Sequence, residues 1–157
     1  MPNLNLVDRK IIDELQRAAD QTYEEIGIKV GASRSVVQRR IASLKMRGVI
    51  KRYTIEVEPG KIGRFMSFIV SISLEREDRD IVNRFKQSIK NCSAVQQCFY
   101  VTGDADFIII LTAKDMAEYD DIVQSLCVDN PNIRAFLTNV VIRPVKTGLD
   151  VPAVESI

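Results

Sequence analysis

Two stripes of apolar residues at the three-and-four spacing of an α-helix open the chain. Asn5 and Asp8 fit the first turn of the first helix, which is the longer of the two. Thr22 and Glu25 have the spacing of a capping box and begin the second helix, which Gly31 closes. The pattern therefore predicts two helices, each with one buried side. The first stripe is Val7, Ile11, Leu15 and Ala18 or Ala19, and the second is Tyr23, Ile26 and Val30.

A third helix is expected between Ser33, a candidate N-cap, and Gly48, a stop signal. Its apolar residues are Val37, Ile41 and Leu44, again at helical spacing. Because a short turn with a glycine separates it from the second helix, the three segments predict a helix-turn-helix. The residues that face outward near its N-terminal end are Arg34, Ser35, Gln38 and Arg39.

The second half of the chain alternates between strand and helix patterns. Between residues 66 and 74 apolar side chains occupy every second position and serines fill most positions between them, which is typical of a half-buried strand. The order βαββαβ predicts a ferredoxin-like fold. The expected elements are a strand at 66–74, a helix capped by Asp78 with Ile81, Val82, Phe85 and Ile89 inward, strands at 95–102 and 107–111, a helix at 116–126 with Tyr119, Ile122 and Val123 inward, and a strand at 133–142.

Both helices of such a fold cover one face of the sheet, so apolar residues on the other face need a partner. Ile69, Ile108 and Ile110 supply this surplus. We therefore expect a homodimer packed sheet to sheet. A dimer also suits a helix-turn-helix protein that binds two DNA half-sites about 34 Å apart. The alternative is that these isoleucines belong to the ordinary core of central strands.

Charge is segregated along the chain, although the formal net charge is only +1. Eight basic residues and no acidic one lie between Lys29 and Arg52. Residues 1–64 carry thirteen Lys or Arg against eight Asp or Glu, a balance of +5, whereas residues 65–157 carry nine against thirteen, a balance of −4. The cationic stretch is typical of a phosphate-binding surface, although a run of charges can also be a solvated helix face.

In a helix-turn-helix the last helix lies in the major groove, and its N-terminal residues reach base edges. Arg34 or Arg39 could bind guanine through two hydrogen bonds, and Gln38 could bind adenine. Ser35 can donate or accept a hydrogen bond. Phosphate contact and plain solvation both stay open for the other cations, Arg40, Lys45, Arg47, Lys51 and Arg52. The candidate DNA-binding residues are Ser33, Arg34, Ser35, Gln38, Arg39, Arg40, Lys45 and Arg52.

This chain resembles the Lrp/AsnC family of feast/famine transcriptional regulators. The resemblance is to the family's DNA-binding domain and linker, and it rests on residues 33–50 (SRSVVQRRIASLKMRGVI), Tyr53 and residues 59–63 (PGKIG). The second half is similar to that family's effector-binding domain. The resemblance implies an α+β protein that dimerises and assembles further, into tetramers or octamers. Its expected parts are a winged-helix-like helix-turn-helix domain at 1–52, a β linker at 53–64 and a ferredoxin-like dimerisation and effector-binding domain at 65–157.

Residues 102–106 (TGDAD) lie between two expected strands. By composition they form a hairpin turn with two solvated carboxylates. The resemblance implies instead that they help line an amino-acid pocket between dimers, where Gly103 admits the ligand and Asp104 or Asp106 meets an α-ammonium group. The effector-binding residues that it implies are Tyr100, Thr102, Gly103, Asp104, Asp106, Thr138 and Asn139; the last two could equally belong to an exposed strand face.

Two stretches depart from the family's usual pattern. Relatives usually carry acidic residues where this chain has Lys45, Met46 and Arg47, which favours stronger nonspecific DNA affinity here. Ala105 often corresponds to an aromatic residue, which favours a more open effector pocket.

Composition narrows the function classes. No apolar run reaches the ~18 residues of a membrane span, and the N-terminus has no signal-peptide pattern. Three cysteines without metal-ligand spacing and the absence of histidine fit reduced thiols in a cytoplasmic protein with no metal and no cofactor. Without a histidine base, a phosphate-binding glycine loop or a nucleophile beside the two aspartates, we expect no enzymatic activity. The cysteines are Cys92, Cys98 and Cys127.

The leading hypothesis is a transcriptional regulator whose basic helix binds double-stranded operator DNA. A small-molecule effector, an amino acid by the resemblance, would alter dimer assembly and hence DNA affinity. One alternative is a nucleoid-type protein that coats and bends DNA without sensing an effector. Another is an enzyme or metabolic sensor whose basic region is only solvated and which binds no DNA at moderate salt.

Overall fold

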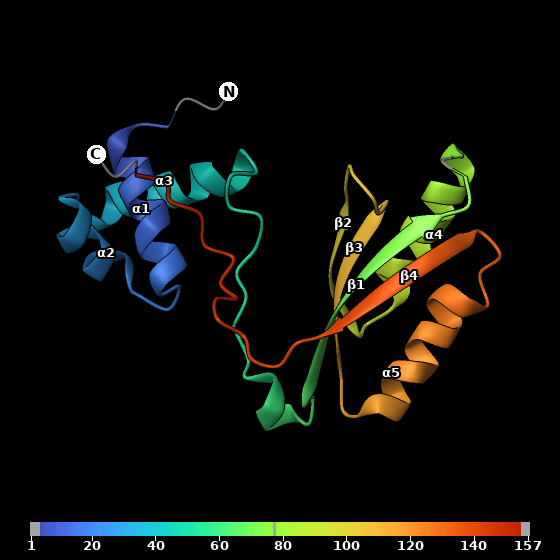
Figure 1. The fold of residues 1–157 in the computed structure, drawn as a ribbon. Coiled ribbons are helices and arrows are strands. Elements are labelled where there is room, and N and C mark those ends of the chain that lie inside the picture. Colours follow the sequence, from blue (N-terminus) through green and yellow to red (C-terminus); the bar gives the residue numbers. More distant parts are fainter. Residues whose placement is uncertain (1–3, 77, 155–157) are drawn as a thin grey trace. The chain divides into compact units, whose positions relative to one another are not determined.

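The computed structural model describes residues 4–76 and 78–154 and divides into two compact units (Figure 1). The helical unit comprises the described residues up to Glu56 together with those from Lys146 onwards, and the rest of the described chain forms the sheet unit. We expected the second domain to include the C-terminal segment. The segment groups with the first unit instead, because side chains of the first helix bind its backbone.

Three helices form the helical unit: α1 (Leu6–Arg17), α2 (Tyr23–Val30) and α3 (Arg34–Met46). They meet over a small apolar core to which each predicted stripe contributes. The described residues of this unit contain no strand. The buried members of the core are Ile11, Ile26, Val30, Val37, Ile41 and Leu44.

Side-chain hydrogen bonds fix the residues at which α1 and α2 begin. The Asn5 side chain accepts from the Asp8 amide at 2.9 Å, and the Asp8 carboxylate accepts from the Asn5 amide in return. Thr22 and Glu25 make the same reciprocal pair at α2, which confirms the predicted capping box. Ser33 occupies the N-cap position of α3, but its hydroxyl makes no capping hydrogen bond to any described residue.

The turn between α2 and α3 brings two backbone segments into contact. The Gly27 carbonyl accepts a hydrogen bond from the Ala32 amide at 2.9 Å. A β-carbon on Gly27 would lie 2.4 Å from the Ala32 carbonyl oxygen, which is closer than a side-chain carbon can approach. Gly31 closes α2 in the left-handed conformation, with φ 71°. The turn therefore depends on two glycines, and only Gly31 stood out in the sequence.

A largely buried ion pair joins α1 to α3. Arg40 Nη1 lies 2.9 Å from Oδ1 of Asp8, whose side chain is 8% exposed. Arg40 Nε is also buried, with no hydrogen-bond partner among the described residues. Arg40 therefore holds α3 against α1, a role that its place in the basic stretch did not reveal.

Four antiparallel strands form the sheet in the order β2-β3-β1-β4, which confirms the ferredoxin-like arrangement. Asp78 caps α4 as predicted, by accepting from two backbone amides of its first turn. None of the helices in the described part of the chain is long and apolar enough to cross a membrane. The elements are β1 (Met66–Leu74), α4 (Arg79–Asn91), β2 (Val95–Tyr100), β3 (Phe107–Ala113), α5 (Met116–Val123), which a π-helical turn (Gln124–Val128) continues, and β4 (Ile133–Val140).

Helices α4 and α5 cover one face of the sheet (Figure 1). The main core lies between them and the strands. Phe68 stacks on Tyr119 there with ring centres 4.0 Å apart, and Phe85 packs against Phe107 at 4.8 Å. From Phe68 to Leu74 the burial of β1 alternates as predicted, so every second side chain there fills this core.

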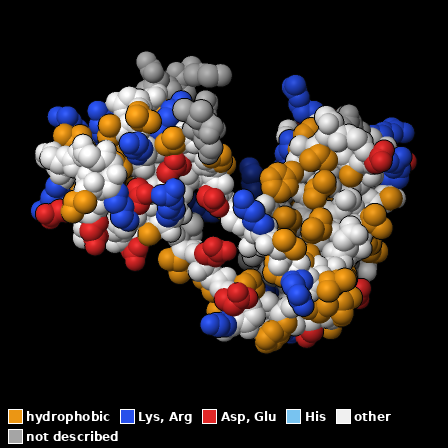
Figure 2. All heavy atoms as spheres, turned by 60° about the vertical axis from the view of Figure 1, so that its left-hand side comes forward, with side chains coloured by type: hydrophobic (Ala, Val, Ile, Leu, Met, Phe, Trp, Pro, Cys, Tyr) orange, Lys and Arg blue, Asp and Glu red, His pale blue; other side chains and the backbone are white. Residues whose placement is uncertain are grey.

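The second face of the sheet, the open face, carries an apolar patch. Ile69 lies opposite Ile110 in the β1–β3 ladder, and Phe99 lies opposite Ile108 in the β2–β3 ladder. Leu137 of β4 joins them and is 65% exposed. Figure 2 shows hydrophobic side chains gathered on the side of the sheet unit that it presents. The open face therefore has the apolar surplus that the sequence predicted.

The linker differs from the expected β linker. Residues 51–58 form no strand, because no other described strand lies beside them to supply a ladder of hydrogen bonds. A short 3₁₀-helix, Pro59–Ile62, follows. Arg64 then anchors the chain within the sheet unit: its guanidinium lies 2.6 Å from the Glu118 carboxylate and donates to the Thr112 carbonyl at 2.5 Å.

Removal of Arg40 should reveal the cost of the buried carboxylate. In Arg40→Ala, Asp8 stays buried without its cation, so we expect the free energy of unfolding of the helical unit to fall by about 1–3 kcal/mol. Arg39→Ala, one residue earlier on the exposed side, should lower it by less than about 0.5 kcal/mol. Denaturant titrations followed by circular dichroism measure both variants. Equal losses would contradict the role given to the ion pair.

Candidate nucleic-acid interface and effector site

Helix α3 presents a polar face to solvent near its N-terminal end. Val37, Ile41 and Leu44 are buried on the opposite side, which leaves the predicted base-reading residues outside. Two arginines and a glutamine on this face supply donors that match base edges in the major groove. The predicted residues at this end of α3 lie together and are all exposed. They are Ser33, Arg34, Ser35, Gln38 and Arg39.

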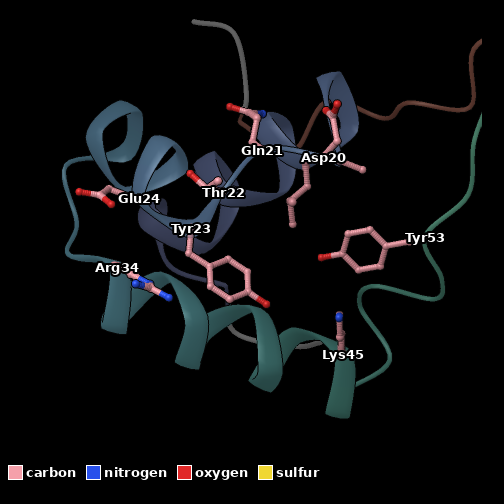
Figure 3. Close-up of a pocket in the computed structure, with 10 residues that line it drawn as sticks. Asp20, Gln21, Thr22, Tyr23, Glu24, Arg34, Lys45 and Tyr53 are labelled. Carbon is pink, nitrogen blue, oxygen red and sulfur yellow. The ribbon is translucent and has the colours of Figure 1, made fainter.

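A hollow of about 630 Å³ flanks α3 within the helical unit (Figure 3). The end of α1, the start of α2, and Arg34 and Lys45 of α3 line it together with Tyr53. The hydroxyl ends of Tyr23 and Tyr53 point toward each other across it. Lys45 Nζ lies 4.4 Å from the centre of the Tyr53 ring, a cation–π contact. The hollow is therefore lined by three hydroxyls, two cations and the carboxylates of Asp20 and Glu24.

The two tyrosines of this hollow were not among the predicted binding residues. Tyr23 was assigned to the apolar stripe of α2, and Tyr53 contributed only to the family resemblance. Burial raises the pKa of Tyr53, with a smaller contribution from nearby Tyr23, so its hydroxyl keeps its proton at neutral pH and can donate a hydrogen bond. A half-buried aromatic residue with a polar end is the signal that could have identified both.

The remaining predicted cations fall into two groups. Arg40 is held by Asp8 inside the helical unit, so its guanidinium is already engaged. Lys45, at the C-terminal end of α3, and Arg52, in the segment after it, are exposed. These two lie where a phosphate backbone beside the helix could reach them.

Residues 102–106 form the turn between β2 and β3, and backbone contacts fix it. Asp106 Oδ2 accepts from the Leu74 amide at 2.6 Å, and the Asp106 amide donates to the Ile72 carbonyl at 2.9 Å. The Ser73 hydroxyl donates to the Asp104 carbonyl at 3.1 Å. The Asp106 carboxylate thus completes the end of β1, whereas residue Asp104 is exposed. Of the two acids considered for an ammonium group, the turn uses one for its own structure.

The other predicted effector residues do not share a face of the sheet in this chain. Thr138 lies opposite buried Val70, and its hydroxyl hydrogen-bonds the Tyr119 hydroxyl of α5. Asn139, the next residue, points to the open face. The Tyr100 ring lies on the helix-covered side, where Lys86 Nζ is 4.6 Å from its centre. The seven residues do not form a single pocket in one chain.

All three cysteines are free thiols, as expected. Burial raises the pKa of Cys127 to about 11. Burial also raises the pKa of Cys98 above its usual value, against a smaller opposing effect of Lys86. Both thiols are therefore protonated at neutral pH.

Family comparisons match both units of the chain. The AsnC-type helix-turn-helix domain matches residues 4–45, and the Lrp/AsnC ligand binding domain matches residues 67–151. Together these matches span α1 to α3 except for Met46, and the sheet with its two helices except for Met66.

Relatives and solved structures agree with this assignment. The chain is 44% identical over 149 residues to an uncharacterized HTH-type transcriptional regulator of Sinorhizobium fredii, with 95% of this chain and 88% of the relative covered. It is 31% identical over 143 residues to the leucine-responsive regulatory protein of Haemophilus influenzae, with 91% and 86% covered. The crystal structure of a Neisseria meningitidis transcriptional regulator in complex with L-Met has the same fold, with a TM-score of 0.89, 23% identity, and 96% and 97% covered. The chain belongs to the Lrp/AsnC family of transcriptional regulators.

Proposed function

We propose that this chain is a cytoplasmic regulator that binds operator DNA through α3 and changes its DNA affinity when the sheet unit binds an amino acid. The observation that carries the proposal is the exposed basic face of α3, held on capped helices in a chain of the Lrp/AsnC family. Effector and DNA would be coupled reciprocally: each would change the affinity for the other by the same factor.

The DNA contacts divide into base reading and phosphate binding. Arg34, Gln38 and Arg39 would read base edges from the N-terminal half of α3. Lys45 would bind phosphate, and the Tyr53 hydroxyl beside it would donate a second hydrogen bond to the same strand. Arg52 and Ser35 complete the set. Arg40 is left out because its guanidinium already neutralises Asp8.

The assembly would be a homodimer formed through the open face. An exposed apolar patch on a sheet whose other face is covered is the surface that a second copy can bury. A two-fold dimer also places two α3 helices to read half-sites about 34 Å apart. Tetramers or octamers would then form from dimers through other surfaces.

The effector would be a free α-amino acid. Two similar proteins support this class: one is named for its response to leucine, and the other was crystallised with L-Met. Asp104 is the better candidate for the α-ammonium group, because the Asp106 carboxylate is occupied by the Leu74 amide. Asn139 on the open face would help complete a pocket between copies, together with Thr102 and Gly103 of the turn.

Arg39→Ala tests the role of α3. We expect it to weaken binding to an operator selected from random duplexes by about 5- to 100-fold and to weaken nonspecific duplex binding much less. Lys45→Ala should weaken both similarly and reduce the slope of log affinity against log salt by about 1. Fluorescence anisotropy across a salt series measures both. Arg79→Ala, which removes the same charge from α4, is the control; an equal loss in it would contradict the assignment.

A thermal-shift screen against the standard amino acids at millimolar concentration tests the effector. We expect one or a few to raise the melting temperature, because a ligand that binds only the folded state stabilises it. Asp104→Ala should remove that shift. Asp106→Ala should instead lower the melting temperature of the free protein, because it leaves the Leu74 amide without its acceptor. If no amino acid shifts the wild type, the effector-free DNA-coating alternative is favoured.

Ile110→Asp tests the open face as the dimer interface. A charge there cannot be buried against a second copy, so we expect dissociation to monomers in sedimentation velocity at micromolar concentration. Ile28→Asp is the matched control, because Ile28 of α2 is 80% exposed in the helical unit. Dimers that persist in Ile110→Asp would show that the copies meet elsewhere.

A further inference from the structure

Side chains of α1 bind the backbone of the C-terminal segment within the helical unit. Gln16 donates to the Val151 carbonyl at 2.8 Å and accepts from the Val151 amide at 2.9 Å. Asp13 accepts from two successive amides, from Ala153 through Oδ1 at 2.9 Å and from Val154 through Oδ2 at 3.1 Å. One carboxylate and one amide side chain thus hold residues 151–154 by their main-chain groups, and the chain bends at Ala153 and Val154.

A third side chain completes this stripe on α1. Arg9 Nη1 donates to the Ala153 carbonyl at 2.8 Å. Arg9, Asp13 and Gln16 are four and three positions apart, so they share one side of the helix. All five hydrogen bonds end on backbone atoms of the segment. The stripe therefore binds the segment through its main chain.

The sequence of the segment suits this mode of binding. Pro152 has no amide hydrogen, and α1 binds the amides on either side of it. Proline also restricts Val151 to extended conformations, which lowers the entropy lost on docking. Residues 147–150, which lead into the segment, are all exposed. Docking is therefore local to residues 151–154.

We propose that Arg9, Asp13 and Gln16 form a peptide-docking site whose ligand is the backbone of residues 151–154 of the same chain. The docked segment gives the sheet unit a second connection to the helical unit, in addition to the linker. The polypeptide runs from β4 directly into this segment. Helix α1 in turn holds α3 through the ion pair between Asp8 and Arg40.

The site has a regulatory consequence, which rests on the proposed function. A change at β4 that pulls on residues 141–150 acts on α1 through the docked segment. Release of the segment removes hydrogen bonds from α1 and loosens the support of α3. The DNA-binding arrangement is then populated less often, and the apparent operator affinity falls in proportion.

Amide hydrogen exchange of the full-length protein, resolved by residue, tests the docking site. We expect the amides of Val151, Ala153 and Val154 to exchange at least ~10-fold more slowly than those of residues 147–150. Asp13→Ala should remove the protection of the last two amides, and Gln16→Ala should remove that of Val151. Asp120→Ala on α5 is the matched control and should leave all three protected.

Two results would overturn docking: free exchange of these amides in the wild type, or unchanged protection in Asp13→Ala. Neither depends on DNA or on an effector, so a failure of the proposed function leaves this measurement decisive.

Operator affinity at fixed salt tests the coupling. Asp13→Ala and Gln16→Ala should each weaken it by about 3- to 10-fold relative to Asp120→Ala, because a smaller fraction of molecules has α3 fully supported. The double variant should lose little more than Asp13→Ala alone, since both changes release one segment. Unchanged affinity in both single variants would overturn the coupling, whatever the exchange rates show.

Discussion

The helical unit depends on one constraint: α3 must bury an apolar stripe and keep its polar side bare. Three short helices enclose little apolar volume, and small units are marginally stable for that reason. Polar interactions supplement the core where it ends: two capping boxes, the pair between Asp8 and Arg40, and the docked C-terminal segment. Each of them acts on α1, on α2 or on the buried side of α3. The polar side chains on the exposed side of α3 are therefore left available for contacts with DNA. Arg40 lies at the boundary between the buried and exposed sides of α3. It belongs to the basic stretch by sequence, but its guanidinium pairs with the buried Asp8 carboxylate.

The sheet unit, in contrast to the helical unit, has a large core. Its two helices and four strands enclose an ample core on one side, where aromatic rings such as Phe68 and Tyr119 stack. The other side of the same strands carries exposed apolar side chains that no described residue of the chain covers. Asp106 shows how polar groups at the sheet end are used: its carboxylate completes the hydrogen bonding of β1, which leaves Asp104 available. A ligand site at this end of the sheet therefore needs polar groups that do not already make hydrogen bonds within the fold.

Local patterns made much of the fold predictable, because they determine local structure. The alternation of β1 predicted its bounds to the residue, and Thr22 with Glu25 predicted the start of α2. The outcome differs where distant segments meet. Arg40 is one of many cations in its stretch, and no local pattern reveals that Asp8 lies beside it. The docked segment is recognised by its backbone, which leaves almost no trace in side-chain pattern. The effector residues came from resemblance alone, and that resemblance says nothing of which face each side chain takes within one chain.

Strand geometry constrains how an effector could act. Neighbouring residues on a strand point to opposite faces, so Thr138 and Asn139 cannot both touch one ligand on one face. If Asn139 contacts a ligand on the open face, Thr138 lies on the helix-covered face, where its hydroxyl hydrogen-bonds the Tyr119 hydroxyl of α5. Strand β4 would then join the ligand, the helix-covered core and the segment that leaves the sheet toward α1. A shift of β4 could reach the helical unit through the C-terminal segment that follows it, and packed cores favour discrete shifts over gradual ones.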